Sequence, residues 1–332
     1  MLFEMGSQQE NHPIEIVIGS DMPAAAKADD ADNTEQPHPQ AIEQKEDAPS
    51  LTLSFKKEID TIEYPILSAH VIGGKPVVPF ALITEWFGHG ALHENPGLVL
   101  HGIDDMRILK GVRLDAQKKL IRLFAGKPSR KNGHFEVSVE LRDGVMEGRD
   151  VIHSRGKAIL TNTIPEPPEI DIAHFNQDAN YHRSVKDVYN DILFHGMELH
   201  GIKEILSCSS KGMTARLSSA PSPSKWIKDH LRSGWIADPL VLDCAFQMAT
   251  VWCYEETGNV SLPSYCASYR QYCSSFPTGG VTALLEVIDL TDHKMTGNFL
   301  LMDKDNRLAA KLTGYEAVLD ASLFKAFKPD QP

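Results

Sequence analysis

The stretch His70-Val-Ile-Gly-Gly-Lys-Pro-Val-Val-Pro79 and its distant counterpart Asp238-Pro-Leu-Val-Leu-Asp-Cys-Ala-Phe-Gln247 decide the fold. The first leads into an apolar segment, residues 79–92, and the second opens another, residues 239–255. We expect both segments to be helices, because their apolar residues recur at helical spacing. Each is followed by strand-like segments. One helix followed by antiparallel strands, occurring twice, predicts an α+β fold in which each helix is wrapped by a curved sheet and the two helix N-termini lie near a shared cleft.

The expected strands are short apolar or alternating segments. In the first half they are residues 99–114, 119–123, 134–141 and 151–160, and in the second half 281–290, 295–303 and 307–319. Residues 302–307, Met-Asp-Lys-Asp-Asn-Arg, contain the residue types that tolerate turn dihedral angles and therefore predict a hairpin turn. The first helix should present an apolar face made of Phe80, Ile83, Phe87 and Leu92.

Composition changes along the chain suggest five parts. Residues 1–20 contain a strand-like fragment, 13–19, and we expect the tail of an upstream domain, or alternatively a strand added to the main sheet. Residues 21–50 are rich in Ala, Asp, Glu, Gln and Pro and predict a disordered acidic linker. The two helix-and-strand repeats should span residues 51–161 and 181–325, joined by a proline-rich linker at 162–180.

The composition is that of a soluble globular protein, with 42% hydrophobic and 23% charged residues. We find neither an apolar run long enough to span a membrane nor a secretory signal. Five cysteines without CxxC spacing argue against a disulfide framework and favour a reducing cytoplasm. The net charge of −12 is concentrated in residues 1–50, which carry −9, so nothing indicates nucleic-acid binding.

The two motifs supply one histidine, His70, and one carboxylate, Asp243, which suffice for acid–base chemistry on a proton next to a carbonyl. A histidine can be a free base near neutral pH. An aspartate that acts as an acid must be protonated, which requires a pKa raised by burial, whereas a helix N-terminus favours the charged form. Gln247 lies one helical turn after Asp243 and can hold its carboxyl by a hydrogen bond.

Four motifs in order resemble those of the dehydratase domains of polyketide and polyunsaturated fatty acid synthases. His70, Gly74 and Pro79 match HxxxGxxxxP, and Asp243 with Gln247 matches DxxxQ/H. Residues 189–199, Tyr-Asn-Asp-Ile-Leu-Phe-His-Gly-Met-Glu-Leu, resemble the YGP region, and residues 262–264, Leu-Pro-Ser, resemble the LPxS element. The resemblance covers roughly residues 51–325 and implies a double hotdog fold, in agreement with the repeat.

The resemblance implies dehydration of a β-hydroxyacyl thioester carried by an acyl carrier protein, with His70 as the base that removes the α-proton and Asp243 as the acid that protonates the departing hydroxyl. We expect no metal, nucleotide or flavin, since proton transfer alone accomplishes the reaction and the substrate arrives on phosphopantetheine. The expected partners are the carrier protein and other domains of the same synthase, with a homodimer as a further possibility. The remaining expected site residues fall in two groups: supporting positions Gln247, Gly74, Pro79, His195 and Gly196, and substrate-binding positions Leu262 and Pro263. Backbone N–H groups of the glycines after His70 could polarise the thioester carbonyl.

Two departures from the family pattern bear on substrate preference: His195 stands where the YGP tyrosine is usual, and Met197 stands where its proline is usual. We expect Met197 to alter the local turn or the floor of the pocket. His89 and His93 have a spacing that can bind metal but lack the glutamate of an HExxH motif. Arg270 should form a surface ion pair, with contact to the carrier as the other interpretation, and Cys244 should pack rather than react.

Three other functions remain open at this point. A double-bond isomerase or cyclase would use the same proton-transfer pair. A hotdog thioesterase would release free acid, and the His70 motif argues against it. A non-catalytic double hotdog module would bind carriers or organise the complex, and it would not need His70, Asp243 and Gln247.

Overall fold

The computed structural model describes residues 50–115, 118–146, 149–170 and 181–328. The part that it describes belongs to one compact unit, residues 47–332. Residues 1–49, where we expect an upstream tail and most of an acidic linker, lie outside the described residues, as does the segment 171–180 of the second linker. Residues 162–170, the described part of that linker, contain neither helix nor strand.

The described strands form one large antiparallel sheet and a small hairpin. The sheet runs in the order β1-β5-β7-β8-β4-β11-β14-β13-β12-β10-β9, with β6 paired to β7, and β2 pairs with β3. The strand bounds are β1 Leu51–Ile59, β2 Val71–Ile72, β3 Lys75–Pro76, β4 Val99–Ile108, β5 Lys119–Gly126, β6 Ser129–Lys131, β7 His134–Met146, β8 Arg149–Thr161, β9 Ile202–Ser209, β10 Gly212–Leu217, β11 Ser261–Gln271, β12 Val281–Leu290, β13 Lys294–Met302 and β14 Leu308–Leu319.

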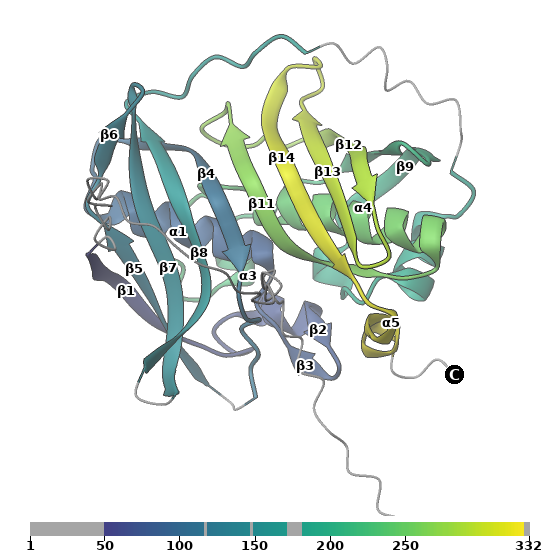
Figure 1. The fold of residues 1–332 in the computed structure, drawn as a ribbon, viewed down its shortest axis with the longest axis horizontal. Helices are drawn as coiled ribbons and strands as arrows, with labels where there is room; N and C mark the ends of the chain where they lie inside the picture. Colours follow the sequence, from purple (N-terminus) through teal and green to yellow (C-terminus); the bar gives the residue numbers. More distant parts are fainter. Residues whose placement is uncertain (1–49, 116–117, 147–148, 171–180, 329–332) are drawn as a thin grey trace, which may run out of the picture. The chain divides into compact units, whose positions relative to one another are not determined.

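Two long helices lie against this sheet, one in each half (Figure 1). α1 (Phe80–His93) packs on β4, β5, β7 and β8, and α4 (Pro239–Thr257) packs on β10, β11 and β12. The two helices also contact each other, with the Phe80 and Phe246 rings 5.5 Å apart. A central helix wrapped by antiparallel strands, present twice in one continuous sheet, confirms the predicted α+β double hotdog fold.

Shorter helical segments connect these parts. They are the 3₁₀ helices η1 (Pro65–Ala69) and η4 (Met197–Leu199), the π-helical turn η3 (Val188–Ile192), and the α-helices α2 (Val185–Asp187), α3 (Pro223–Trp226) and α5 (Ala321–Phe327). α5 follows the last strand and lies beside the β2–β3 hairpin (Figure 1).

Both long helices were predicted within two residues of their bounds, and burial on α1 extends beyond the predicted apolar face, of which Leu92 is only half-buried. Phe80, Ile83 and Phe87 are buried as expected, and so are Leu82 and Trp86 on its other sides. A helix that is apolar all round belongs in a core. The sheet and α4 pack against α1 so that most of the helix is buried, and His93 in its last turn is its exposed residue.

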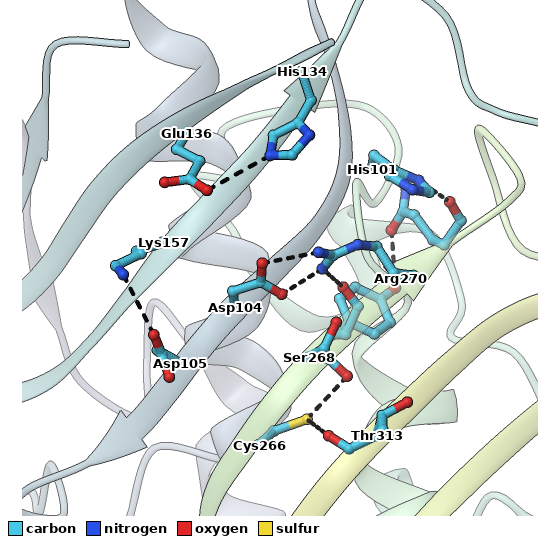
Figure 2. Close-up of polar contacts among 12 residues, drawn as sticks. His101, Asp104, Asp105, His134, Glu136, Lys157, Cys266, Ser268, Arg270 and Thr313 are labelled. Carbon is cyan, nitrogen blue, oxygen red and sulfur yellow. Dashed lines mark hydrogen bonds and ion pairs between the residues drawn. The ribbon is translucent and has the colours of Figure 1, made fainter. Parts of the chain in front are cut away.

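The two halves of the sheet join where β4 pairs with β11 (Figure 2). Gly102 is required there, because a Cβ at this position would lie 1.9 Å from the carbonyl oxygen of Tyr269. Arg270 on β11 donates to both carboxylate oxygens of Asp104 on β4, at 2.6 and 2.8 Å. The predicted ion pair of Arg270 is thus confirmed, and it bridges the two repeats.

Three further outcomes concern strands and cysteines. The predicted strand at 99–114 ends at Ile108, since residues 112–114 turn to pair with residues 76–78. Strands β1, β2, β3, β6, β9, β10 and β11 were not predicted. All five cysteines are free.

Among the described residues, no helix is long and apolar enough to cross a membrane.

Candidate active site

His70 lies directly after η1 and is 7% exposed. Its Nδ1 is 2.8 Å from the carbonyl oxygen of Val77. A carbonyl only accepts, so Nδ1 carries the proton and Nε2 keeps its lone pair. Burial lowers the pKa of His70 to about 4, against which the bond to Val77 acts in the opposite direction. At neutral pH, His70 is therefore an uncharged base whose free nitrogen is Nε2.

The segment between His70 and Val77 is the β2–β3 hairpin. Its two turn residues, Gly73 and Gly74, have φ of 57° and 75°, a region that favours glycine. The N–H of Gly73 donates to the carbonyl of Ala326 in α5, at 2.9 Å. That N–H is therefore not available to a substrate carbonyl, and the expectation for the glycine N–H groups is wrong at Gly73. Gly74 is exposed at the hairpin tip, and its supporting role stays a prediction.

Pro79 is the residue that precedes α1, with φ of −60° and an extended ψ. Its carbonyl accepts the first hydrogen bonds of the helix, from the N–H groups of Leu82 and Ile83. The neighbouring Val78 donates to the carbonyl of Val112. Pro79 thus helps to define how the chain passes from the His70 hairpin into the buried helix.

Asp243 is the fifth residue of α4 and is 4% exposed. Burial raises its pKa to about 7, and the hydrogen bond from Gln247 acts against this rise. The first free N–H groups of the helix are taken by Asp238, whose carboxylate accepts from Leu240 and Val241. Burial therefore outweighs the helix N-terminus at Asp243, and much of this carboxyl is protonated near neutral pH.

Gln247 holds Asp243 as the sequence predicted. Its Nε2 donates to Oδ2 of Asp243 at 2.8 Å and to the carbonyl of Leu199 at 3.0 Å. Its Oε1 accepts from the hydroxyl of Tyr189 at 2.8 Å, and that hydroxyl in turn accepts from the N–H of Ile202 at 3.0 Å. Tyr189 was not predicted to support the site. A buried tyrosine needs a polar partner, but the sequence does not say which one.

His195 lies next to Asp243 and His70, although 125 residues separate the two histidines in the chain. Its Nε2 is 3.5 Å from Oδ2 of Asp243, and the two imidazole rings are 5.3 Å apart. One donor atom from each of His70, His195 and Asp243 lies within 4.8 Å of the other two. Burial lowers the pKa of His195 well below its ordinary value, so this imidazole is also uncharged.

Gly196 brings the His195 loop against the His70 segment. Its N–H donates to the carbonyl of Ala69 at 2.7 Å, and a Cβ on Gly196 would lie 3.0 Å from the Cα of Ala69. The next residue, Met197, is 83% exposed and begins η4. Met197 therefore does not form the floor of a buried pocket, contrary to one of our two expectations for it.

The other predicted positions lie outside this cluster. Leu262 and Pro263 are on β11, paired with Val318 and Ala317 of β14, and their role in substrate binding stays a prediction. Cys244 is buried, and burial raises the pKa of its thiol well above the ordinary value, in keeping with a packing role. Nδ1 of His89 accepts from Arg232 rather than sharing a ligand with His93.

A layer of aromatic residues covers the cluster from the side of α5. The Phe194 ring is 4.8 Å from the His70 ring, and the Phe327 ring is 4.5 Å from the Phe194 ring. Nζ of Lys328 donates to the carbonyl of Tyr189 at 3.0 Å. His70, His195 and Asp243 are thus all buried, in surroundings where electrostatic interactions are stronger than in water.

Known proteins resemble this chain in both sequence and fold. The family model described as polyketide synthase dehydratase N-terminal domain matches residues 174–318. A polyunsaturated fatty acid synthase subunit of Thraustochytrium sp. is 28% identical over 221 residues, which are 64% of this chain and 8% of the relative. The chain therefore matches only a small part of that relative.

Solved dehydratase domains share the fold at low sequence identity. The dehydratase domain from the CurF module of curacin polyketide synthase has a TM-score of 0.64 and 18% identity, over 80% of this chain and 93% of that one. Two inactive mutants of the CurK dehydratase, with a histidine changed to phenylalanine and an aspartate changed to asparagine, have TM-scores of 0.62 and 0.63 at 18% and 17% identity. They cover 80% and 82% of this chain, and 92% of each CurK chain is matched. In sequence this chain is similar to the dehydratase domains of polyketide synthases and to a segment of a polyunsaturated fatty acid synthase subunit, and it has the double hotdog fold of the polyketide synthase dehydratase domains.

Proposed function

We propose that this protein dehydrates a β-hydroxyacyl thioester to the enoyl thioester. The observation that carries the proposal is the pairing, within 4.8 Å in one buried site, of an uncharged histidine with a carboxyl whose pKa is raised to about 7. A base and an acid with such different pKa values can remove one proton and supply another at the same pH.

In the proposed reaction, Nε2 of His70 takes the proton from the α-carbon of the thioester. The electrons of that C–H bond form the new double bond, and the bond between the β-carbon and its oxygen breaks. Asp243 gives its proton to the departing hydroxyl, which leaves as water. His70 then carries a positive charge and Asp243 a negative one, and a proton transfer between them, directly or through water, restores the starting state.

The supporting residues fit these two roles. The bond from Nδ1 of His70 to Val77 fixes the tautomer that leaves Nε2 free, and Gln247 orients the carboxyl of Asp243. The inactive CurK mutants replace a histidine and an aspartate, the same two residue types. No metal, nucleotide or flavin has a step to perform in this scheme.

We further propose that the substrate arrives on the phosphopantetheine arm of an acyl carrier protein, within a multidomain synthase. The similarity to one segment of a much longer polyunsaturated fatty acid synthase chain supports this proposal.

The test is turnover of 3-hydroxyacyl thioesters of several chain lengths, on carrier protein and on a pantetheine analogue, followed by mass spectrometry. We expect the wild-type chain to remove one water, and His70→Gln and Asp243→Asn to remove none while keeping the wild-type fold. Free acid as the product would instead identify a thioesterase. With an enoyl thioester as the substrate instead, a product whose double bond has moved would identify an isomerase. Bound carrier without any turnover would identify a non-catalytic module.

A further inference from the structure

His70, His195 and Asp243 combine two imidazoles with one carboxylate at a single point of the fold. They come from three separate segments: the end of η1, the loop before η4, and α4. Their donor atoms lie within 4.8 Å of one another, and all three residues are buried. Histidine nitrogen and aspartate oxygen are ligands that Zn²⁺ uses in catalytic three-residue sites, where the fourth position is left to water or substrate.

The proposed dehydration assigns no role to His195. Its Nδ1 is buried and has no hydrogen-bond partner among the described residues. Its Nε2 is 3.5 Å from Oδ2 of Asp243, which is longer than the normal range of an N–H···O bond. Orphaned buried polar groups cost free energy, roughly 1 to 3 kcal/mol each. Neither ring nitrogen of His195 therefore makes a normal hydrogen bond within the described residues, and Nε2, the nitrogen that faces Asp243, is free to bind a metal ion.

The separation of His195 from Asp243 suits a shared metal ion. Two ligands on a tetrahedral Zn²⁺, each about 2 Å from the ion, lie about 3.3 Å apart. The 3.5 Å between Nε2 of His195 and Oδ2 of Asp243 is close to that value. The third ligand atom lies within 4.8 Å of both, so it has to move closer by at most about 1.5 Å to complete the site.

Hydrogen bonds from neighbouring groups already orient two of the three ligands. Nδ1–H of His70 donates to Val77, the kind of outer contact that fixes the tautomer of metal-binding histidines. Gln247 donates to Asp243 and so orients its carboxylate. The exposed end of α1, with His89 and His93, has no such arrangement, because His89 is bonded to Arg232.

We propose that His70, His195 and Asp243 bind one Zn²⁺ ion and that the ion inhibits the enzyme. Bound zinc occupies the lone pair of His70 that would take the α-proton, and it replaces the proton that Asp243 would give. No redox step is involved, and chelation restores both groups. The inhibition rests on the proposed dehydration, whereas zinc binding itself does not.

The test is a zinc titration of the tag-free full chain, by competition with a chromogenic chelator, which needs no turnover. We expect one high-affinity site in the wild-type protein and in the control variant His93→Gln. In His195→Gln and in Asp243→Asn the affinity should fall at least as far as it does for outer-contact mutations, roughly 10- to 100-fold. Circular dichroism establishes that each variant is folded, and the near-isosteric Asp243→Asn provides a second reading if His195→Gln is not.

The matching activity measurement adds zinc and then chelator during dehydration. We expect zinc to compete with the thioester substrate and the chelator to restore the rate. Equal zinc affinity in the wild type, His195→Gln and Asp243→Asn would overturn the site, as would no binding at millimolar zinc. A protein that binds zinc in the expected pattern but turns over no hydroxyacyl thioester would keep the site and refute the proposed dehydration.

Discussion

Gln247→Leu removes the side chain that connects Asp243 to the rest of the site. In the wild type this amide makes three buried hydrogen bonds: to Asp243 at 2.8 Å, to Leu199 at 3.0 Å and from Tyr189 at 2.8 Å. Each contributes about 1 kcal/mol net, and leucine leaves the buried partners unsatisfied, so we expect the free energy of unfolding to fall by about 3 kcal/mol. Denaturant unfolding measures this loss.

The same substitution should also change the pH dependence of the reaction. The hydrogen bond from Gln247 lowers the pKa of Asp243 and opposes the effect of burial. Without it, the pKa rises above about 7, and Asp243 stays protonated to higher pH. The alkaline limb of kcat/KM for dehydration should therefore move to higher pH, although the maximal rate falls because the carboxyl is less well oriented.

Tyr189→Phe is the matched control for this prediction. It removes the hydroxyl that bonds Gln247 and Ile202 but leaves the contact between Gln247 and Asp243 in place. We expect lower stability, by about 2 kcal/mol, with the alkaline limb unchanged. An alkaline limb that does not move in Gln247→Leu would refute the assignment of that limb to Asp243. Unchanged stability would refute the hydrogen-bond network.

Three further predictions concern buried groups. The pKa of Asp243 in the folded protein lies above its ordinary value of 3.8, so the stability that the protonated carboxyl contributes is present below about pH 4 and is lost as pH rises through about 7. Asparagine does not titrate, so Asp243→Asn should gain stability relative to the wild type over that pH range, as measured by urea unfolding. Gly196→Ala places a Cβ 3.0 Å from the Cα of Ala69 and should destabilise by roughly 1 to 3 kcal/mol and slow dehydration, whereas an unchanged melting temperature would contradict the close approach. Glu85→Leu leaves the N–H groups of residues 236 and 237 without their acceptor and should cost about 2 to 4 kcal/mol, more than Glu85→Gln, which keeps an acceptor oxygen; equal losses would contradict that contact.

The parts of the fold that sequence reasoning predicted are those with a strong local pattern. α1 and α4 are long apolar runs, and the strands at 281–290 and 294–302 alternate or are bounded by turn residues. β4 was predicted too long because residues 109–114 continue its apolar pattern. What ends the strand is a long-range interaction, the pairing of Val77 with Arg113, which no local pattern encodes.

The candidate site also combines residues that a local sequence pattern predicts with contacts that only the folded chain brings about. His70, Asp243 and Gln247 stand at motif spacings, and Gln247 meets Asp243 because residues four apart share a helix face. The approach of His195 to Asp243 depends instead on the path of residues 189–201, held by the contact of Gly196 with Ala69. The raised pKa of Asp243 likewise depends on burial from every side, and this becomes visible only once the chain is folded.

The measurement that tests the account most directly is the pH dependence of kcat/KM for dehydration of a 3-hydroxyacyl thioester. We expect activity that rises through about pH 4, as His70 loses its proton, and falls through about pH 7, as Asp243 loses its own. His70→Gln and Asp243→Asn should both be inactive across the range. A rate that keeps rising through pH 7 to an alkaline plateau would contradict the role of Asp243 as the acid, and full activity in either variant would contradict the pair.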